Sequence, residues 1–314
     1  MSRLAALTGA TGFVGGHVAA ALAARGWRLR VLARRTPRLD LGPTPVEVVP
    51  GELGDPAALD ALAAGADAVI HVAGAVRARG RDGFMAVNRD GAAALAAAVA
   101  RRAPGARAVL VSSLAARAPE ISDYAASKAA GEAAFAEACP AAAVLRPGAV
   151  YGPGDRATLA LFRAARWPVQ PLLGAPGARV TVLHARDLAE AVAAAAEAEG
   201  PVLWELSDAC AEGRTWPEIA AAACRARSRP LRAVALPAAL VRAAGRVGDL
   251  GARLPLLPPP ILTSGKAREI LHADWSVDPA RRPPAALWRP RIDLDAGFAE
   301  TVAWYRAEGW IGRG

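Results

Sequence analysis

Thr8-Gly9-Ala10-Thr11-Gly12-Phe13-Val14-Gly15 is the stretch of this 314-residue chain that decides its fold, because it joins an apolar run to a helical pattern. The G-x-x-G-x-x-G spacing permits a tight turn and a close backbone approach to a ligand. N–H groups at the start of the next helix then face an anion. A loop directly after the first strand therefore predicts a pyrophosphate site for a dinucleotide. The expected contacts are Gly9, Thr11, Gly12, Phe13, Val14 and Gly15.

Two arginines follow the second predicted strand. In dinucleotide-binding folds, an acidic residue about 20 residues beyond the glycines binds the ribose 2′-hydroxyl of NAD. Arg34 and Arg35 occupy that place here. Guanidinium groups bind a 2′-phosphate, which a carboxylate would repel. We therefore expect NADP(H) as the cofactor, with NAD(H) as the alternative.

Strand-like runs and helix-like stretches alternate through the first two-thirds of the chain. Strands are expected at 4–8, 28–33, 46–49, 68–72, 108–112 and 143–146. Helices are expected at 13–25, 56–64, 84–102 and 124–138. This alternation predicts βαβ units with right-handed crossovers. The expected fold class is α/β, a doubly wound, Rossmann-like parallel sheet.

The pattern loosens after about residue 150, where Pro and Gly cluster. We expect residues 1–165 to form the dinucleotide-binding domain, with an additional helix and strand within 187–206. Residues 166–314 are expected to form mainly a smaller C-terminal lobe that binds the substrate. Helices at 216–226 and 298–308 would belong to this lobe.

Composition narrows the class of protein. The chain is 54% apolar, which argues against disorder, and no uncharged apolar run is long enough to span a membrane. Its net charge is +9, but the arginines are scattered without interleaved aromatics, so neither nucleic acid nor membrane is expected as a partner. Three cysteines without a CxxC pair predict reduced thiols and a cytoplasmic protein. A homodimer is left open.

Tyr124 and Lys128 lie four residues apart, hence on one face of a predicted helix. The pKa of a free tyrosine is about 10, and an adjacent ammonium favours the phenolate, which suits proton transfer. The chain has three tyrosines and two lysines, so this pairing stands out against an arginine-rich background. Ser112 and Ser113 end a strand, at the edge where parallel sheets bind ligands. These four residues predict a catalytic site.

Together these motifs resemble the extended or atypical short-chain dehydrogenases/reductases of the NAD-dependent epimerase/dehydratase superfamily. The resemblance covers nearly the whole chain, because further segments match beyond the glycine loop, the serines and the Tyr–Lys pair. Those segments are His71-Val-Ala-Gly74, Val87-Asn88-Arg-Asp-Gly91, Arg146-Pro-Gly-Ala-Val-Tyr-Gly-Pro-Gly154, His184-Ala-Arg-Asp187 and Thr301-Val-Ala-Trp304-Tyr305.

The resemblance implies roles for the matching residues. Tyr124 would be the acid or base, and Lys128 would hold the nicotinamide ribose and lower the pKa of Tyr124. Ser113 would orient the reacting carbonyl or hydroxyl, with Ser112 as the alternative. Further cofactor contacts are implied for Glu52, Leu53, Ala73, Gly74, Lys128, Pro147 and Val150.

Three other matching residues are expected to be structural. Asn88 would brace neighbouring backbone. His71 has no companion at metal-ligand spacing, so no metal site is expected. Asp187 would cap a helix or anchor a loop.

The resemblance implies an NADP(H)-dependent oxidoreductase that interconverts a ketone or aldehyde and an alcohol. A small, fairly apolar substrate is favoured by the side chains of the segment 159–183. Those side chains are Leu161, Phe162, Trp167, Leu172 and Leu173. Two alternatives stay open. One is a nucleotide-sugar epimerase or dehydratase that retains its cofactor, and the other is a non-catalytic NAD(P)-binding regulatory or assembly protein.

Overall fold

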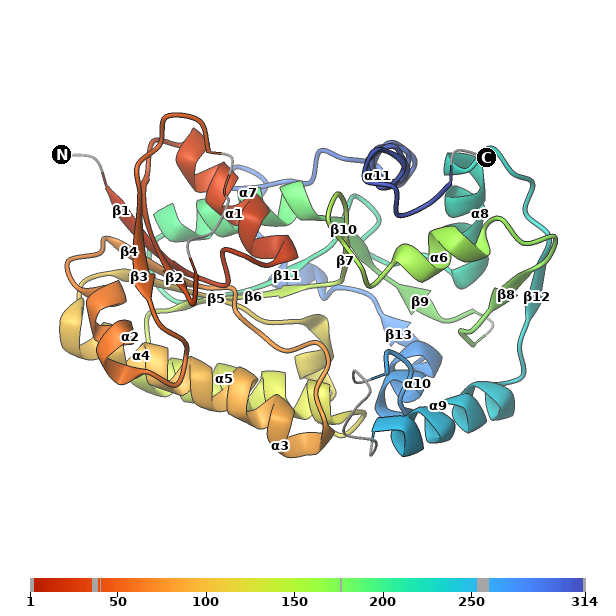
Figure 1. Ribbon diagram of the computed structural model, residues 1–314, viewed down its shortest axis with the longest axis horizontal. Helices are drawn as coiled ribbons and strands as arrows, with labels where there is room; N and C mark the ends of the chain where they lie inside the picture. Colours follow the sequence, from red (N-terminus) through yellow and green to blue (C-terminus); the bar gives the residue numbers. More distant parts are fainter. Residues whose placement is uncertain (1–2, 36–38, 40, 176, 253–259, 313–314) are drawn as a thin grey trace. The chain divides into compact units, whose positions relative to one another are not determined.

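Packing divides the chain into two compact units in the computed structural model, which describes residues 3–35, 39, 41–175, 177–252 and 260–312 (Figure 1). Unit 1 comprises Met1–Pro147, Leu188–Glu205 and Pro283–Arg289. Unit 2 comprises Gly148–Asp187, Leu206–Arg282 and Pro290–Gly314. The chain thus first leaves unit 1 after Pro147, earlier than the expected boundary at 165. A division of cofactor and substrate binding between domains stays a prediction.

Unit 1 contains a seven-stranded sheet in the order β11-β6-β5-β4-β1-β2-β3. From β1 the order runs outward through β2 and β3 on one side and through β4, β5 and β6 on the other, with parallel register throughout β1–β6. This is the doubly wound α/β topology that the sequence predicted. The strands are β1 (Leu4–Thr8), β2 (Arg28–Ala33), β3 (Val46–Pro50), β4 (Ala68–His71), β5 (Arg107–Val111), β6 (Ala143–Pro147) and β11 (Val202–Leu206).

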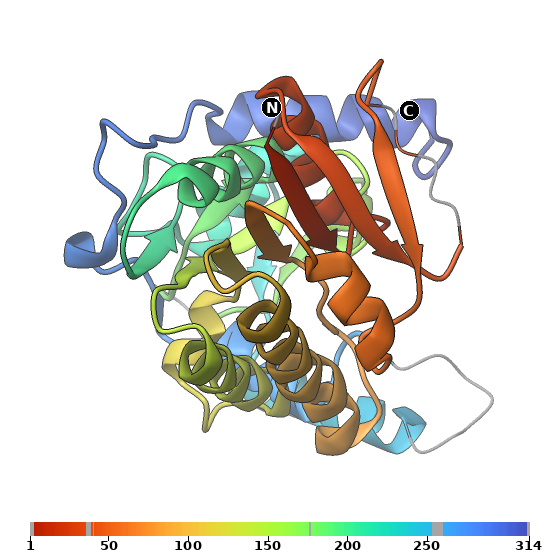
Figure 2. The same cartoon turned by 90° about the vertical axis from the view of Figure 1, so that its left-hand side faces the viewer.

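Helices cover both faces of this sheet (Figures 1 and 2). One face carries α1 (Phe13–Ala24) and α7 (Ala185–Glu197). The other carries α2 (Pro56–Ala63), α4 (Gly91–Arg102) and α5 (Asp123–Ala138). Because both faces are covered, the central strands are mostly apolar, and β1 and β4 are buried at every residue.

The prediction of a single helix over 84–102 is wrong in one respect, because the helix is interrupted in the structure. The segment consists of α3 (Gly80–Met85), a π turn over Ala86–Asp90, and α4. The interruption lies where α5 comes very close, since a Cβ on Gly131 would stand 2.2 Å from the Asn88 carbonyl oxygen. Such π turns widen a helix locally and often occur at functional sites.

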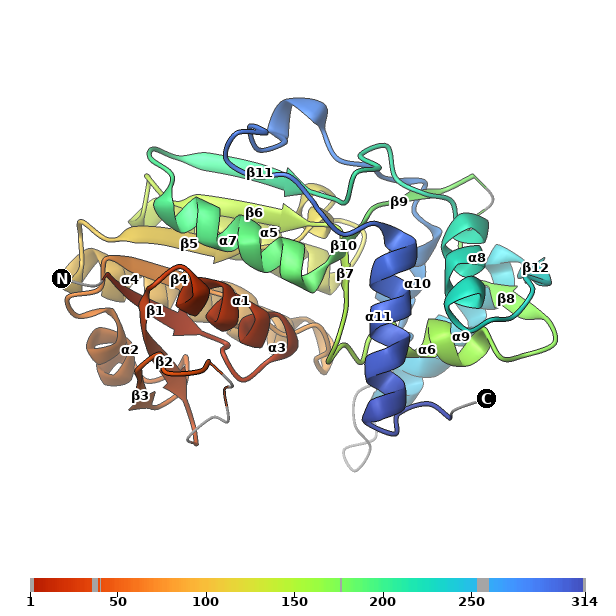
Figure 3. The same cartoon turned by 90° about the horizontal axis from the view of Figure 1, so that it is seen from above.

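Unit 2 is built from short parallel strand pairs and five helices among its described residues (Figure 3). The pairs are β7 (Ala149–Tyr151) with β10 (Val182–His184), β8 (Gln170–Leu172) with β12 (Ala233–Ala235), and β9 (Arg179–Val180) with β13 (Asp274–Trp275). The helices are α6 (Leu159–Ala164), α8 (Trp216–Ala226), α9 (Ala238–Ala252), α10 (Ser264–Leu271) and α11 (Leu294–Ala307).

An aromatic cluster forms the core of unit 2. The ring of Phe298 lies 4.8 Å from Tyr151 and 4.9 Å from Phe162, and Tyr305 lies 5.6 Å from Phe162. Phe162 is fully buried here, so it packs the core and does not line a substrate pocket. Trp167, from the same candidate segment, is instead 57% exposed. No helix within the described ranges combines the length and the apolar character needed to cross a membrane.

Candidate active site

The glycine-rich loop connects β1 to α1 and leaves no room for side chains at two positions. Gly9 has φ +78°, and a Cβ there would stand 2.6 Å from the backbone nitrogen of Ala73. A Cβ on Gly15 would stand 1.9 Å from the carbonyl oxygen of Gly9. Gly12 begins α1 and is exposed, and this helix start has neither a side-chain cap nor an acidic residue. The first turn of α1 therefore suits an anion such as a pyrophosphate.

Thr8 and His71 support the loop from the ends of β1 and β4. The Thr8 hydroxyl is 2.7 Å from His71 Nδ1, and it accepts from the backbone N–H of Ala73 at 3.4 Å. Burial, together with the positive charge of Lys128, lowers the pKa of His71 to about 3. The imidazole is therefore neutral and stacks on Phe135. His71 is a structural residue of the loop, and no group of His, Cys, Asp and Glu in the described part of the chain could hold a metal.

The residues predicted to recognise the adenosine half follow β2 and β3. Arg34 and Arg35 come directly after β2, and both are exposed. Glu52 follows β3 and is also exposed, whereas Leu53 packs against Gly91, where a Cβ would lie 2.8 Å from Leu53 Cδ1. All four lie at the carboxyl edge of the sheet, where ligands bind in open α/β folds. Their contacts with a cofactor stay predictions.

Helix α5 positions the predicted Tyr–Lys pair. Its N-cap, Ser122, accepts from the backbone N–H of Ala125 at 3.0 Å, and Ser127 donates to the Tyr124 carbonyl oxygen at 2.8 Å. Tyr124 and Lys128 are both half-buried on the same face. The Tyr124 ring makes an edge contact with Phe84, at 6.0 Å between centroids.

Lys128 joins α5 to the neighbouring strand ends. Its Nζ donates to the Val111 carbonyl oxygen at 2.9 Å, and a Cβ on Gly74 would lie 3.6 Å from Nζ. Burial lowers the pKa of Lys128 to about 8, and the carboxylate of Glu132 opposes that shift. The amine is therefore mostly protonated at neutral pH. It lies beside the Gly74 backbone that the sequence assigned to the cofactor.

The two serines at the end of β5 differ in what they contact. Ser112 is buried, and its hydroxyl donates to a carboxylate oxygen of Glu132 in a very short hydrogen bond. Ser113 is half-buried, and its hydroxyl accepts from the backbone N–H of Ala115 at 3.2 Å. A hydroxyl group that accepts a hydrogen bond through its oxygen still has its own proton to donate in a second hydrogen bond. The structure therefore leaves Ser113, rather than Ser112, with a proton to donate.

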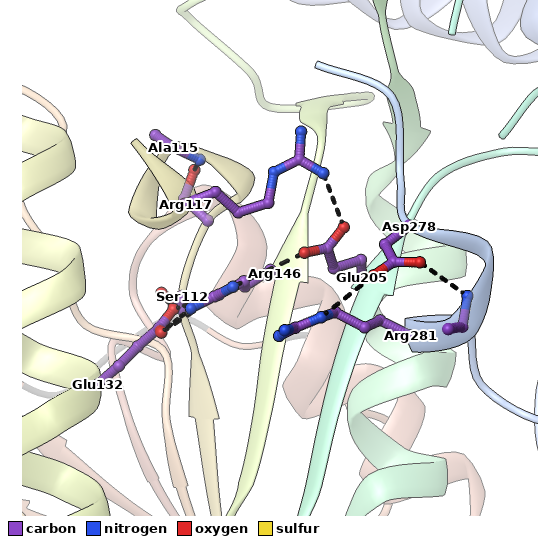
Figure 4. Close-up of polar contacts among 10 residues, drawn as sticks. Ser112, Ala115, Arg117, Glu132, Arg146, Glu205, Asp278 and Arg281 are labelled. Carbon is purple, nitrogen blue, oxygen red and sulfur yellow. Dashed lines mark hydrogen bonds and ion pairs between the residues drawn. The ribbon is translucent and has the colours of Figure 1, made fainter. Parts of the chain in front are cut away.

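Glu132 belongs to a network of ion pairs behind these serines (Figure 4). It pairs with Arg146 of β6 at 2.6 and 2.9 Å, and Arg146 lies 3.7 Å from Glu205 of β11. Glu205 also pairs with Arg117 at 3.0 Å, and its side chain is fully buried. Two carboxylates thus face two guanidiniums, which offsets the cost of burying each charge. Neither Glu132 nor Glu205 was predicted from the sequence as a site residue, although Glu132 continues the four-residue spacing of Tyr124 and Lys128.

Two structural expectations are confirmed. Asn88 accepts from the Ala75 N–H at 2.8 Å and donates to the Ala75 carbonyl at 3.0 Å and to Ser127 at 2.9 Å, so it braces backbone. Asp187 accepts from the backbone N–H groups of Arg291 and Ile292 at 3.1 and 3.0 Å, so it anchors a loop within unit 2.

Pro147 and Val150, the last two predicted cofactor contacts, fall in different units. Pro147 ends β6 and is buried in unit 1. Val150 lies in β7 of unit 2 and pairs with Leu183. Their joint contact with a nicotinamide stays a prediction.

The fold and these residues define an NAD(P)-binding enzyme of the Rossmann type. The chain belongs to the NAD dependent epimerase/dehydratase family, whose family model matches residues 5–203. It is an oxidoreductase of that family, as the sequence predicted.

Individual relatives agree with this assignment. The chain is 48% identical over 311 residues to the ceramide reductase of Caulobacter vibrioides, covering 98% of this chain and 95% of that protein. It is 54% identical over 66 residues to the (4-alkanoyl-5-oxo-2,5-dihydrofuran-3-yl)methyl phosphate reductase of Streptomyces griseus, 21% of this chain and 23% of that one. The UDP-glucose 4-epimerase structure from Bifidobacterium longum, with NAD⁺ and UDP, matches at a TM-score of 0.70 and 16% identity over 98% of this chain and 99% of that one. At that identity the likeness concerns the fold alone.

Proposed function

We propose that this protein uses NADPH to reduce a ketone on a ceramide-type lipid to a secondary alcohol. The likeness to a ceramide reductase over nearly the full length of both chains supports the substrate class. Ceramide carries a secondary hydroxyl, and a reductase that forms it must begin with a ketone at that carbon. One observation supports a reduction with proton transfer from the protein: Lys128 and Tyr124 lie on one face of α5. Lys128 Nζ also donates a hydrogen bond to the carbonyl at the end of β5, beside the serines.

Each catalytic side chain has a separate task in this proposal. The nicotinamide, when bound, supplies the hydride to the carbonyl carbon. Tyr124 donates its phenolic proton to the carbonyl oxygen, so the ketone becomes a secondary alcohol and the tyrosine becomes a phenolate. The ammonium of Lys128 stabilises that phenolate. Ser113 donates a hydrogen bond to the same substrate oxygen and orients it.

The residues of unit 1 fit a bound dinucleotide. The narrow loop and the uncapped start of α1 suit the pyrophosphate. Exposed Arg34 and Arg35 support a preference for NADP(H) over NAD(H), because guanidiniums pair with a 2′-phosphate. We expect Arg34→Asp to weaken NADPH binding while leaving NADH binding within a few-fold. If the wild-type protein bound NADPH and NADH with equal affinity, the proposed preference for NADP(H) would be contradicted.

The cytoplasmic location is proposed on the state of the cysteines. Cys139, Cys210 and Cys224 are all free thiols, which suits a reducing compartment.

The test of the function is a product analysis with NADPH deuterated at the transferable position. The substrates are a keto analogue of ceramide, a short apolar ketone, and a UDP-sugar. We expect one deuterium on the new carbinol carbon of the keto-ceramide, with one NADPH oxidised for each alcohol formed. Interconversion of the UDP-sugar without net NADPH oxidation would support the epimerase alternative and overturn the proposal.

A further inference from the structure

The inner face of α9 (Ala238–Ala252) packs very closely against the start of α10 (Figure 1). Val241 and Gly245 are buried there. A Cβ on Gly245 would stand 2.9 Å from the carbonyl oxygen of Thr263, and one on Gly248 would stand 1.8 Å from that of Leu262. This face therefore fixes how α9 is rotated, and the opposite side of the helix must point outward.

The outward face of α9 is apolar, which is unusual for a helix at a protein surface. Leu240, Val247 and Leu250 are 55%, 71% and 65% exposed. With exposed Ala243 they follow one another at spacings of three, four and three residues, so they form one stripe along the helix. A row of large exposed apolar side chains marks an interaction surface rather than chance exposure. We name these four residues the α9 stripe.

Positive charge borders the α9 stripe. Arg242 and Arg246 are one turn apart on its flank, and both are exposed. Asp249 is the acidic residue of this helix, and its carboxylate accepts from the backbone N–H of Ser264 on the inner side. An apolar stripe flanked by arginines has the chemistry of a helix that lies in a membrane interface, with apolar side chains among the acyl chains and guanidiniums at the lipid phosphates.

We propose that the α9 stripe docks this enzyme onto the surface of a bilayer that contains anionic lipid. This rests on the proposed function, because a ceramide-type substrate resides in a membrane and no described helix spans one. The α9 stripe extends over eleven residues, with a rise of about 15 Å from its first residue to its last. Its three large side chains cover far less than the roughly 800 Å² per partner of a stable dimer. A bilayer surface therefore fits better than a second copy of the chain. The proposal departs from the sequence expectation that no membrane is a partner.

The test is flotation of the purified full chain with vesicles, without substrate or cofactor. One set of vesicles is phosphatidylcholine alone, and the other contains one part in four of phosphatidylglycerol. We expect binding to the anionic vesicles to fall by about tenfold or more in the double variant Val247→Glu/Leu250→Glu. Leu287→Glu is the matched control, since Leu287 is 50% exposed in unit 1, and it should bind as the wild type does. Arg242→Gln/Arg246→Gln should lose the preference for anionic vesicles.

The α9 variants should keep wild-type turnover of a short water-soluble ketone, which shows that they fold and work. Wild-type protein that stays unbound to anionic vesicles, or α9 variants that float as well as wild type, would overturn the proposal. A wild-type dimer that the glutamate variant breaks would assign the stripe to a second copy instead. Vesicle binding without reduction of a keto-ceramide would refute the proposed function and leave the docking surface intact.

Discussion

Lys128 and Val111 are joined by a hydrogen bond of 2.9 Å from the lysine Nζ to the backbone carbonyl, which ties helix α5 to the carboxyl end of β5. Ser112 and Ser113 follow Val111 directly, so this bond sets the distance between the serines and the face that carries Tyr124. An ammonium has three donors, and Val111 takes one of them. Lys128 therefore has donors left for a ribose hydroxyl and for the phenolic oxygen.

Lys128→Arg is predicted to be a severe change. A guanidinium is wider than an ammonium and spreads its donors over a rigid fork. Gly74 lies close to the lysine Nζ, so the fork would crowd the backbone beside the proposed nicotinamide ribose. We expect turnover to fall by about 10²-fold or more, with weaker NADPH binding measured by fluorescence titration. An arginine variant with wild-type turnover and affinity would show that neither catalysis nor cofactor binding depends on the ammonium of Lys128.

Glu132→Gln is predicted to move the alkaline limb of the pH–rate profile to lower pH. Lys128 interacts electrostatically with His71 and Glu132, and His71 is neutral above about pH 3. The Glu132 carboxylate raises the pKa of Lys128 against burial, so without it the ammonium loses its proton at a lower pH. We expect a displacement of about one pH unit.

The control for this variant is Glu137→Gln, an exposed position on the same helix, which should leave the profile in place. Ser112→Ala removes the hydroxyl that is hydrogen-bonded to Glu132. It therefore tests whether the end of β5 moves when this hydrogen bond is lost. A profile that stays at its wild-type position while the melting temperature falls would assign Glu132 a purely structural role.

His71→Gln is predicted to make the protein less sensitive to acid. The pKa of His71 is about 3 in the folded state against about 6.5 when unfolded, so folding favours the neutral ring. That contribution is present above pH 6.5 and is lost as the pH falls toward 3. From pH 7 to pH 4 the variant should therefore lose about 3 kcal/mol less unfolding free energy than the wild type. Urea unfolding at the two pH values measures this difference, and equal losses in the variant and the wild type would contradict it.

Gly12→Val is predicted to abolish cofactor binding while the protein still folds. A Cβ at Gly12 would lie 3.3 Å from the Gly9 carbonyl oxygen, a tight contact that a small shift relieves, and it would stand where the pyrophosphate must approach. Gly15→Ala would place its Cβ 1.9 Å from the same oxygen and should destabilise unit 1 instead. Circular dichroism and NADPH titration separate the two effects. A folded Gly12→Val variant with normal affinity would mean that the loop does not hold the pyrophosphate.

Regular periodicity made most of unit 1 predictable. β1 and β2 begin and end where the sequence placed them, and so does α8 of unit 2, because buried strands and amphipathic helices have strong local patterns. The π turn at Ala86–Asp90 was not predictable, since it depends on the close approach of Gly131 from another helix. The strand pairs of unit 2 were missed because two- or three-residue strands such as Arg179–Val180 carry no period.

The site shows the same division between local and distant signals. Tyr124 and Lys128 could be paired from helical spacing alone. The choice between Ser112 and Ser113 could not be made, because it depends on Glu132, which lies 20 residues from Ser112 in the chain. The role of Glu205 was even harder to predict, because its ion-pair partner Arg117 lies 88 residues away in the chain. A buried charge network of this kind is visible only after the strands are arranged in the sheet.

The most direct test of the account is Tyr124→Phe, assayed for NADPH binding and for single-turnover reduction of a keto-ceramide analogue. The phenylalanine ring keeps the contact with Phe84 and removes only the hydroxyl that donates the proton. We predict an unchanged dissociation constant for NADPH and a reduction rate lower by about 10²–10⁴-fold. A rate within a few-fold of the wild type would contradict the account, because another group would then be donating the proton.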